Sequence, residues 1–242
     1  MKFKALFPNQ KPVMAMLHLK SDQRMNMLER AQAETRCYLE NGVDALLVEN
    51  YFGSADDCEQ VLAWLQKEYP RACYGVNILG DYEKAFELAD KYNACFIQID
   101  SVCGHLTPGA DAAYAEKLNA LRKASKAVLL GGVRFKYQPV RSGRSLEEDL
   151  ILGTQRCDAI VVTGEGTGMV TPIGKVIEFR QILGDFPLVM GAGVTPDTLD
   201  ETFQYCDGAI VGSYMKDEHR DIGDVNAEYV KEFMTKKRSI TK

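Results

Sequence analysis

Short apolar runs alternate with amphipathic stretches along the whole chain, and this alternation constrains the fold more than any other feature. A strand followed each time by a helix is the pattern of a parallel sheet, whose strands are buried on both faces. The runs expected as strands are Val13–Leu19, Asp44–Val48, Cys73–Ile78, Phe96–Ile99, Val128–Val133, Ala159–Val162, the stretch from Leu188 to Val194, and Gly208–Val211.

The intervening stretches carry helix signals. Ser145 and Glu148 form a predicted capping box, and Thr195 is predicted to cap a helix that has Pro196 at its first position. Helices are also expected at Arg24–Glu40, Ala55–Glu68, Tyr82–Tyr92, Ala112–Ser125, Pro172–Leu183 and Val225–Met234.

Eight strands and eight helical patterns with no dividing linker predict a single-domain (β/α)8 TIM barrel over residues 1–242. The cationic run after about residue 235 is expected to be a frayed tail. A doubly wound open sheet is the alternative, but it would place a glycine-rich turn after the first strand. Here that turn reads His18-Leu19-Lys20-Ser21.

Composition limits the classes of function. A net charge of −5 argues against a general nucleic-acid surface. Seven cysteines without a CxxC pair suit buried thiols in a reducing cytoplasm, with no disulfide scaffold or zinc site. We expect neither a signal peptide nor a membrane span, because no apolar segment approaches the required length.

Two glycine-containing turns near the C-terminus predict a phosphate site. Gly191 and Gly193 follow the seventh strand, and Gly212 with Ser213 follows the eighth. A (β/α)8 barrel binds phosphate in these two turns, where backbone N–H groups without a nearby Cβ can approach an anion. The alternative is that both are only tight strand-to-helix turns.

Polar residues end six successive strands, where barrel enzymes place their chemistry. Glu49, Asp100 and His18 are candidate acid/base groups, and Lys136 is a candidate for polarising an oxygen or forming a Schiff base. Predicted substrate contacts are Asn50, Asn77, Arg134 and Thr163. Each of these residues could instead serve the structure alone, as a hydrogen-bonded residue at the end of a buried strand.

Four cations in a short segment indicate an anionic substrate: Arg134, Lys136, Arg141 and Arg144. Arg134 and Lys136 are expected on one face, whereas Arg141 and Arg144 are expected to pair with Glu147 and Glu148. No cofactor is firmly implied. A divalent metal on Glu49, Asp100 and His18 stays open on ligand type, although no spacing motif supports it.

Five blocks of the sequence together resemble the BtpA/SgcQ family, and they lie in order between residues 13 and 216. They are Val13–Leu19, Gly42–Asn50, Gly75–Leu79, Asp158–Gly164 with Thr167-Gly168, and Gly191–Thr195. The resemblance implies a TIM barrel of the ribulose-phosphate-binding kind. One family member is associated with photosystem I assembly and another with a presumed sugar-metabolism gene cluster. No reaction is firmly attached to the family.

The chain departs from the family pattern in two places. The family has Glu-Asn followed by an aromatic residue, Gly and Asp, whereas Tyr51-Phe52-Gly53-Ser54 lacks that acid. Asp100 stands where the family tends to have an Asn-containing turn, so no role for Asp100 follows from the resemblance.

Three functions compete at this point. The first is isomerase, epimerase or lyase chemistry on a small phosphorylated sugar or related metabolite of carbohydrate metabolism. The second is a non-catalytic assembly factor, and the third is a module that binds a phosphorylated metabolite without turnover. Because barrels of this kind often pair through their outer helices, we also expect a homo-oligomer.

Overall fold

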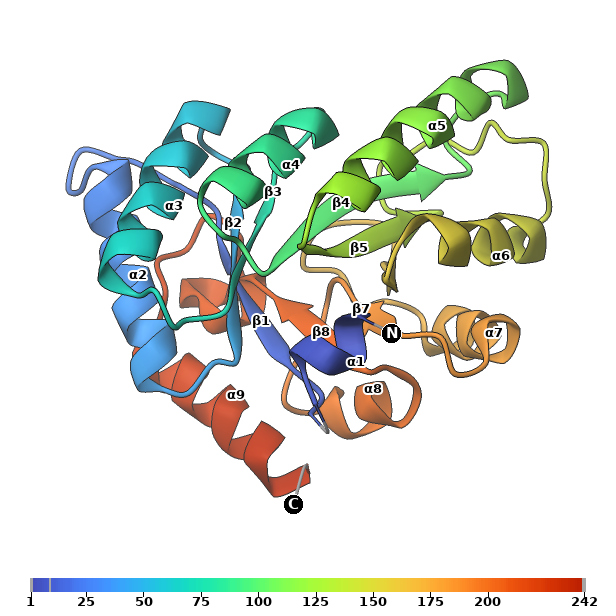
Figure 1. Cartoon of the computed structure of the whole chain (residues 1–242). Coiled ribbons are helices and arrows are strands. Elements are labelled where there is room, and N and C mark those ends of the chain that lie inside the picture. Colours follow the sequence, from blue (N-terminus) through green and yellow to red (C-terminus); the bar gives the residue numbers. More distant parts are fainter. Residues whose placement is uncertain (1, 9, 241–242) are drawn as a thin grey trace.

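The eight predicted strands are all present and close into a parallel barrel in sequence order, β1 to β8, in a computed structural model that describes residues 2–8 and 10–240. The predicted TIM barrel is therefore confirmed (Figure 1). The strands are β1 (Val13–Leu17), β2 (Ala45–Glu49), β3 (Tyr74–Asn77), β4 (Phe96–Cys103), β5 (Val128–Val133), β6 (Ala159–Val162), β7 (Leu188–Met190) and β8 (Gly208–Val211).

Helices connect the strands and cover the outside of the barrel (Figure 1). They are α2 (Met27–Glu40), α3 (Ala55–Glu68), α4 (Tyr82–Lys91), α5 (Pro108–Ala124), α6 (Leu146–Arg156), α7 (Ile173–Leu183), α8 (Leu199–Tyr205) and α9 (Ala227–Ile240). The predicted capping box is confirmed, because the Ser145 side chain accepts from Glu148 N and the Glu148 carboxylate accepts from Ser145 N.

Two apolar clusters hold these layers together. The inner cluster fills the barrel with side chains such as Met14, Phe96 and Val189, and the outer one lies between strands and helices. The barrel is thus a packed core, which leaves room for a cavity only at an end.

A helix that the sequence pattern did not reveal closes the amino-terminal end of the barrel. This helix, α1 (Lys2–Leu6), places Phe3 against the inner cluster, and Phe7 follows directly behind it. Both rings are buried, at 1% and 6% exposure. Figure 1 shows α1 lying across this end of the strands. At five residues, α1 is too short for periodicity to identify it.

Several predicted helix ends are wrong. The helix α2 begins at Met27 and not at Arg24, and α5 begins at Pro108 and not at Ala112. Thr195 does not cap α8; Thr195 and Thr198 form a turn, with Thr198 N donating to Thr195 O at 3.2 Å, and α8 begins at Leu199. The chain after residue 235 is not frayed, because α9 continues to Ile240. Lys237 Nζ lies 3.0 Å from an Asp44 carboxylate oxygen, so a cationic run that looks solvated in sequence pairs with the barrel.

Within the described residues, no helix is both long and apolar enough to span a membrane.

Candidate functional site

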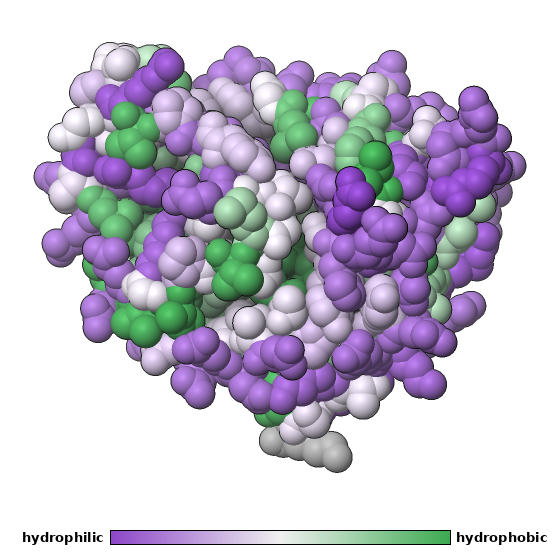
Figure 2. All heavy atoms as spheres, turned by 180° about the vertical axis from the view of Figure 1, so that it is seen from behind, coloured by the Kyte–Doolittle hydropathy of each residue, from purple (hydrophilic) through white to green (hydrophobic). Residues whose placement is uncertain are grey.

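A cavity opens at the carboxyl ends of the strands, at the end opposite α1. Figure 2 views the molecule from behind Figure 1 and shows a hollow near the middle of this face. All four predicted catalytic residues line it, as do all four predicted phosphate-binding residues: His18, Glu49, Asp100, Lys136, Gly191, Gly193, Gly212 and Ser213. The structure therefore brings the two sets together, and their roles stay predictions.

One amide holds two acids together on one side of the cavity. Asn77 Nδ2 donates to Glu49 Oε2 at 2.7 Å and to Asp100 Oδ1 at 3.2 Å. The barrel register explains this arrangement, because Glu49 and Asn77 are direct partners across β2 and β3. Gln98, two residues before Asp100 on β4, donates to the same Asp100 oxygen at 3.4 Å. Its own amide oxygen is buried and has no partner among the described residues.

Burial raises the pKa of both acids. Desolvation raises the pKa of Glu49 to about 7, and the neighbouring Asp100 carboxylate adds to this effect. Desolvation also raises the pKa of Asp100. The Asn77 amide acts in the other direction on both groups, because it donates to their charged forms. A carboxyl group that titrates near neutral pH can both accept and return a proton.

A buried lysine stands behind the predicted histidine. Lys216 Nζ lies 2.9 Å from His18 Nδ1, and the two residues are 1% and 4% exposed. Desolvation lowers the pKa of His18 well below its usual value, and the Lys216 charge adds to this. Burial also lowers the pKa of Lys216. In its protonated form Lys216 only donates, so Nδ1 of a neutral His18 ring would accept from it and Nε2 would be the ring donor. The His18 ring also stacks on Tyr51, with centroids 4.8 Å apart.

Four loops, those after β2, β5, β6 and β8, meet over the cavity through hydroxyl contacts. Tyr51 from the β2 loop donates to an Asp221 carboxylate oxygen at 3.0 Å, and its hydroxyl oxygen also lies 3.4 Å from Thr167 Oγ1. Lys136 Nζ donates to the same threonine oxygen at 3.0 Å. Thr167 therefore connects the glycine-rich segment 164–168 to the loops after β2 and β5 at the mouth of the cavity.

Three of the four residues in the two glycine turns present unused backbone donors, whereas Gly191 N donates to Val162 O at 2.8 Å and is not available to a phosphate. In the described parts of the chain, no protein acceptor takes the N–H of Gly193, Gly212 or Ser213. Gly193 has φ of +73°, and a Cβ there would lie 2.2 Å from Met169 O, so only glycine fits beneath the β6 loop. Gly193, Gly212 and Ser213 line the cavity together with Lys136, a combination that suits an anion.

Four predicted substrate contacts do not line the cavity. Asn77 acts from behind, by bridging the two acids, and Asn50 Oδ1 accepts from Leu79 N at 2.7 Å. Thr163 Oγ1 accepts from Lys136 N at 2.8 Å. Arg134 donates to Asp149 at 2.9 Å, away from the cavity.

The expectation that Arg134 and Lys136 share a face is wrong. The strand ends at Val133, and Arg134 has a positive φ of 51°, which breaks the side-chain alternation. Arg144 pairs with Asp111 at 2.7 Å and with Asp149 at 3.3 Å, and not with the expected Glu147 and Glu148.

The three acid/base candidates do not gather as a metal site. Within residues 2–8 and 10–240, no group of three His, Cys, Asp or Glu side chains could hold a metal ion. Asp100 and Glu49 share Asn77, whereas His18 is held by Lys216.

Sequence reasoning missed several residues of the cavity and its supports: Lys216, Tyr51, Gln98, Thr167, Asp221 and His219. Tyr51 follows directly on Glu49-Asn50, and Gln98 precedes Asp100 by two residues, so strand alternation could have indicated both. Lys216 and Asp221 lie in an irregular segment with two short 3-10 helices, for which periodicity carries no signal.

The fold and the cavity define a (β/α)8 barrel with a polar site at the carboxyl ends of its strands. The chain belongs to the BtpA family, whose model matches residues 9–239. An uncharacterized protein of Thermococcus kodakarensis is 30% identical over 90% of this chain and 92% of its own length.

More distant matches agree with the fold. The photosystem I biogenesis protein BtpA of Synechocystis is 23% identical over 82% of this chain and 75% of its own length. Among solved structures, the tryptophan synthase α chain of Legionella pneumophila superposes with a TM-score of 0.66 at 12% identity. That match covers 99% of this chain and 96% of the other. At that identity the similarity concerns the fold alone.

Proposed function

We propose that this protein is an enzyme that performs acid/base chemistry on a small phosphorylated metabolite. The reaction class is isomerisation, epimerisation or carbon–carbon bond cleavage of a phosphorylated sugar or a related compound. The observation that carries the proposal is that one cavity is lined both by Glu49 and Asp100, which Asn77 bridges from behind, and by the two turns with free backbone donors.

Glu49 is the proposed proton-transfer group. Its pKa of about 7 matches the operating pH of a general acid/base in neutral solution. Asp100 raises that pKa by charge repulsion, and Asn77 holds both carboxyl groups in place. In a substrate bound between them, the two acids would serve as proton donor and acceptor on neighbouring carbons or oxygens.

The other polar groups of the cavity would stabilise negative charge on the substrate. A neutral His18 ring that accepts from Lys216 at Nδ1 would donate a hydrogen bond from Nε2 to a developing oxyanion, and Lys136 would stabilise the same charge. The N–H groups of Gly193, Gly212 and Ser213 would hold the phosphate at a remote end of the substrate. Binding energy from that end would then position the reacting carbons against Glu49.

A thermal-shift screen with sugar phosphates and their unphosphorylated parents tests the proposal. A ligand present at 100 times its Kd adds about 2.7 kcal/mol, which corresponds to several degrees for a chain of this size. Ser213→Asp should abolish the shift because its carboxylate repels the phosphate, whereas Ser239→Asp on the exposed face of α9 should retain it. Glu49→Gln should retain binding and abolish turnover.

A second candidate function comes from the name of the Synechocystis relative. A protein that acts only in assembly would need no occupied cavity, and no phosphorylated compound would then shift its melting temperature. That result would contradict our proposal and favour the assembly role.

A further inference from the structure

Two cysteines lie next to each other at the amino-terminal end of the barrel, remote from the cavity. Cys73 immediately precedes β3 and Cys95 immediately precedes β4, the neighbouring strand. The barrel hydrogen bonds fix both backbones: Cys73 O accepts from Leu46 N at 3.0 Å, and Cys95 N donates to Tyr74 O at 2.7 Å. Cys95 O in turn accepts from Val128 N at 3.0 Å.

The strand register puts the two cysteines at disulfide-forming distance. Gly75 pairs with Phe96, so Cys73 and Cys95 are diagonal neighbours across the two strands. A strand spacing of about 4.8 Å and a rise of about 3.3 Å per residue separate such Cα atoms by roughly 6 Å. Disulfides span Cα distances of about 4.4 to 6.8 Å. Both side chains also pack against the same inner cluster, as does Leu6 of α1.

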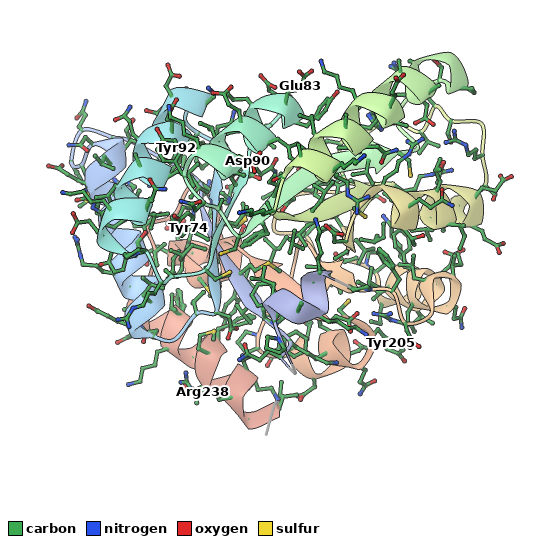
Figure 3. All side chains as sticks on the ribbon, viewed as in Figure 1. Tyr74, Glu83, Asp90, Tyr92, Tyr205 and Arg238 are labelled. Carbon is green, nitrogen blue, oxygen red and sulfur yellow. The ribbon has the colours of Figure 1, made fainter. Side chains whose placement is uncertain are left out.

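Tyr74 keeps this corner of the barrel rigid. Its hydroxyl donates to Tyr92 O at the end of α4, at 2.7 Å, which ties β3 to the segment that leads into Cys95. Figure 3 labels both tyrosines. The two thiols are therefore held as neighbours by the chain on either side of them.

The pair differs in exposure from the four buried cysteines, and in chemistry from Cys37. The expectation of buried thiols holds for Cys58, Cys103, Cys157 and Cys206, whereas Cys73 and Cys95 are only partly buried. A hydrogen bond from Cys73 lowers the pKa of Cys95 to about 6, whereas burial raises the pKa of the partly buried Cys37. Since the thiolate is the nucleophile, Cys95 combines reactivity, access and an adjacent second thiol.

We propose that Cys73 and Cys95 form an oxidation site, at which a hydroperoxide converts the two thiols into an intramolecular disulfide. The Cys95 thiolate attacks the peroxide, whose O–O bond breaks, to give the sulfenic acid and hydroxide. The Cys73 thiol then attacks the Cys95 sulfur; the S–O bond breaks, the S–S bond forms, and water leaves with the Cys73 proton. The protein loses two electrons and the peroxide gains them.

The test uses the full-length reduced protein and one equivalent of hydrogen peroxide. Free thiols are then blocked with N-ethylmaleimide, and peptides are mapped by mass spectrometry without reduction. We expect one disulfide, between the peptides that contain Cys73 and Cys95, and five alkylated cysteines. A disulfide that joins other cysteines, or oxidation spread evenly over the chain, would overturn the proposal.

Single variants separate the two roles. Cys95→Ser should consume peroxide at least tenfold more slowly than the wild type. Cys73→Ser should react at a similar rate but stop at a sulfenic acid that dimedone traps. Cys37→Ser is the matched control, because it removes a different partly buried thiol, and it should form the wild-type disulfide. Wild-type rates in Cys95→Ser, with an unchanged melting temperature, would contradict the assignment. None of these outcomes depends on ligand binding in the cavity.

Discussion

Replacing Glu49 with glutamine should stabilise the folded protein, and the gain should grow with pH. Glu49 is 6% exposed, and its pKa of about 7 in the folded state exceeds the ordinary value of 4.5. The unfolded chain therefore releases this proton at lower pH than the folded protein does. Because the folded state holds the proton more tightly, stability falls between about pH 4.5 and pH 7 and then levels off.

The size of the effect follows from the same two values. Each pKa unit corresponds to about 1.4 kcal/mol, so ionised Glu49 costs the folded state roughly 3 kcal/mol above pH 7. Glutamine keeps an oxygen that can accept from Asn77 Nδ2, now 2.7 Å from Glu49 Oε2, but carries no charge. It also removes the repulsion with Asp100. Glu49→Gln should thus melt several degrees above the wild type at pH 8 and much closer to it at pH 5.

Urea denaturation of both proteins at pH 5 and pH 8 measures this difference directly. Glu201→Gln, an exposed residue of α8, is the control and should show no such pH dependence. If the stability difference between wild type and Glu49→Gln is the same at both pH values, the buried-acid argument is wrong. A group that destabilises the fold and is nevertheless present is the expected mark of a functional residue.

Three other variants test separate parts of the structure. Lys216→Met should raise the pKa of His18, because a nearby positive charge is lost. Nitrogen-15 NMR of the His18 ring measures this pKa and the tautomer. A pKa and a tautomer equal to those of the wild type would show that the contact with Lys216 is unimportant. Asp149→Asn should lower the free energy of unfolding, measured by urea denaturation, by about 3–5 kcal/mol, because Arg134 and Arg144 lose a fully buried charged partner. A loss below about 1 kcal/mol would argue against a structural role for Asp149. Gly75→Ala places a Cβ 2.4 Å from the Phe96 ring and should lower the free energy of unfolding by about 1–3 kcal/mol. A melting temperature equal to that of the wild type would show that the Phe96 ring can move aside without cost.

The barrel could be predicted from sequence because burial on both faces leaves an uninterrupted apolar run for each strand. Val128–Val133 and Ala159–Val162 match the predicted strands at both ends. The ends of the helices were less certain, because tertiary contacts decide them. Asn26 caps α2 with a side-chain hydrogen bond from Glu29 N, so that helix begins three residues after the predicted start.

Half of the cavity follows from one rule, that residues at the carboxyl ends of barrel strands gather at one face. Glu49, Asp100 and His18 fall under this rule. Lys216 does not, because it lies beyond β8 in a segment without regular structure, and only the closed barrel carries it back to His18. Arg134 shows the opposite error, since a single turn at the strand end directs its side chain out of the cavity.

The closed amino-terminal end gives the cavity a dead-end shape. Phe3 and Phe7 fill the amino-terminal end of the barrel. In the part of the chain that the structure describes, a ligand therefore reaches the cavity through the mouth at the opposite end. In the proposed reaction, the product would therefore leave by the route along which the next substrate enters, past the contacts of Tyr51 with Thr167 and Asp221. Entry of a substrate and release of a product through this one mouth would then exclude each other in time.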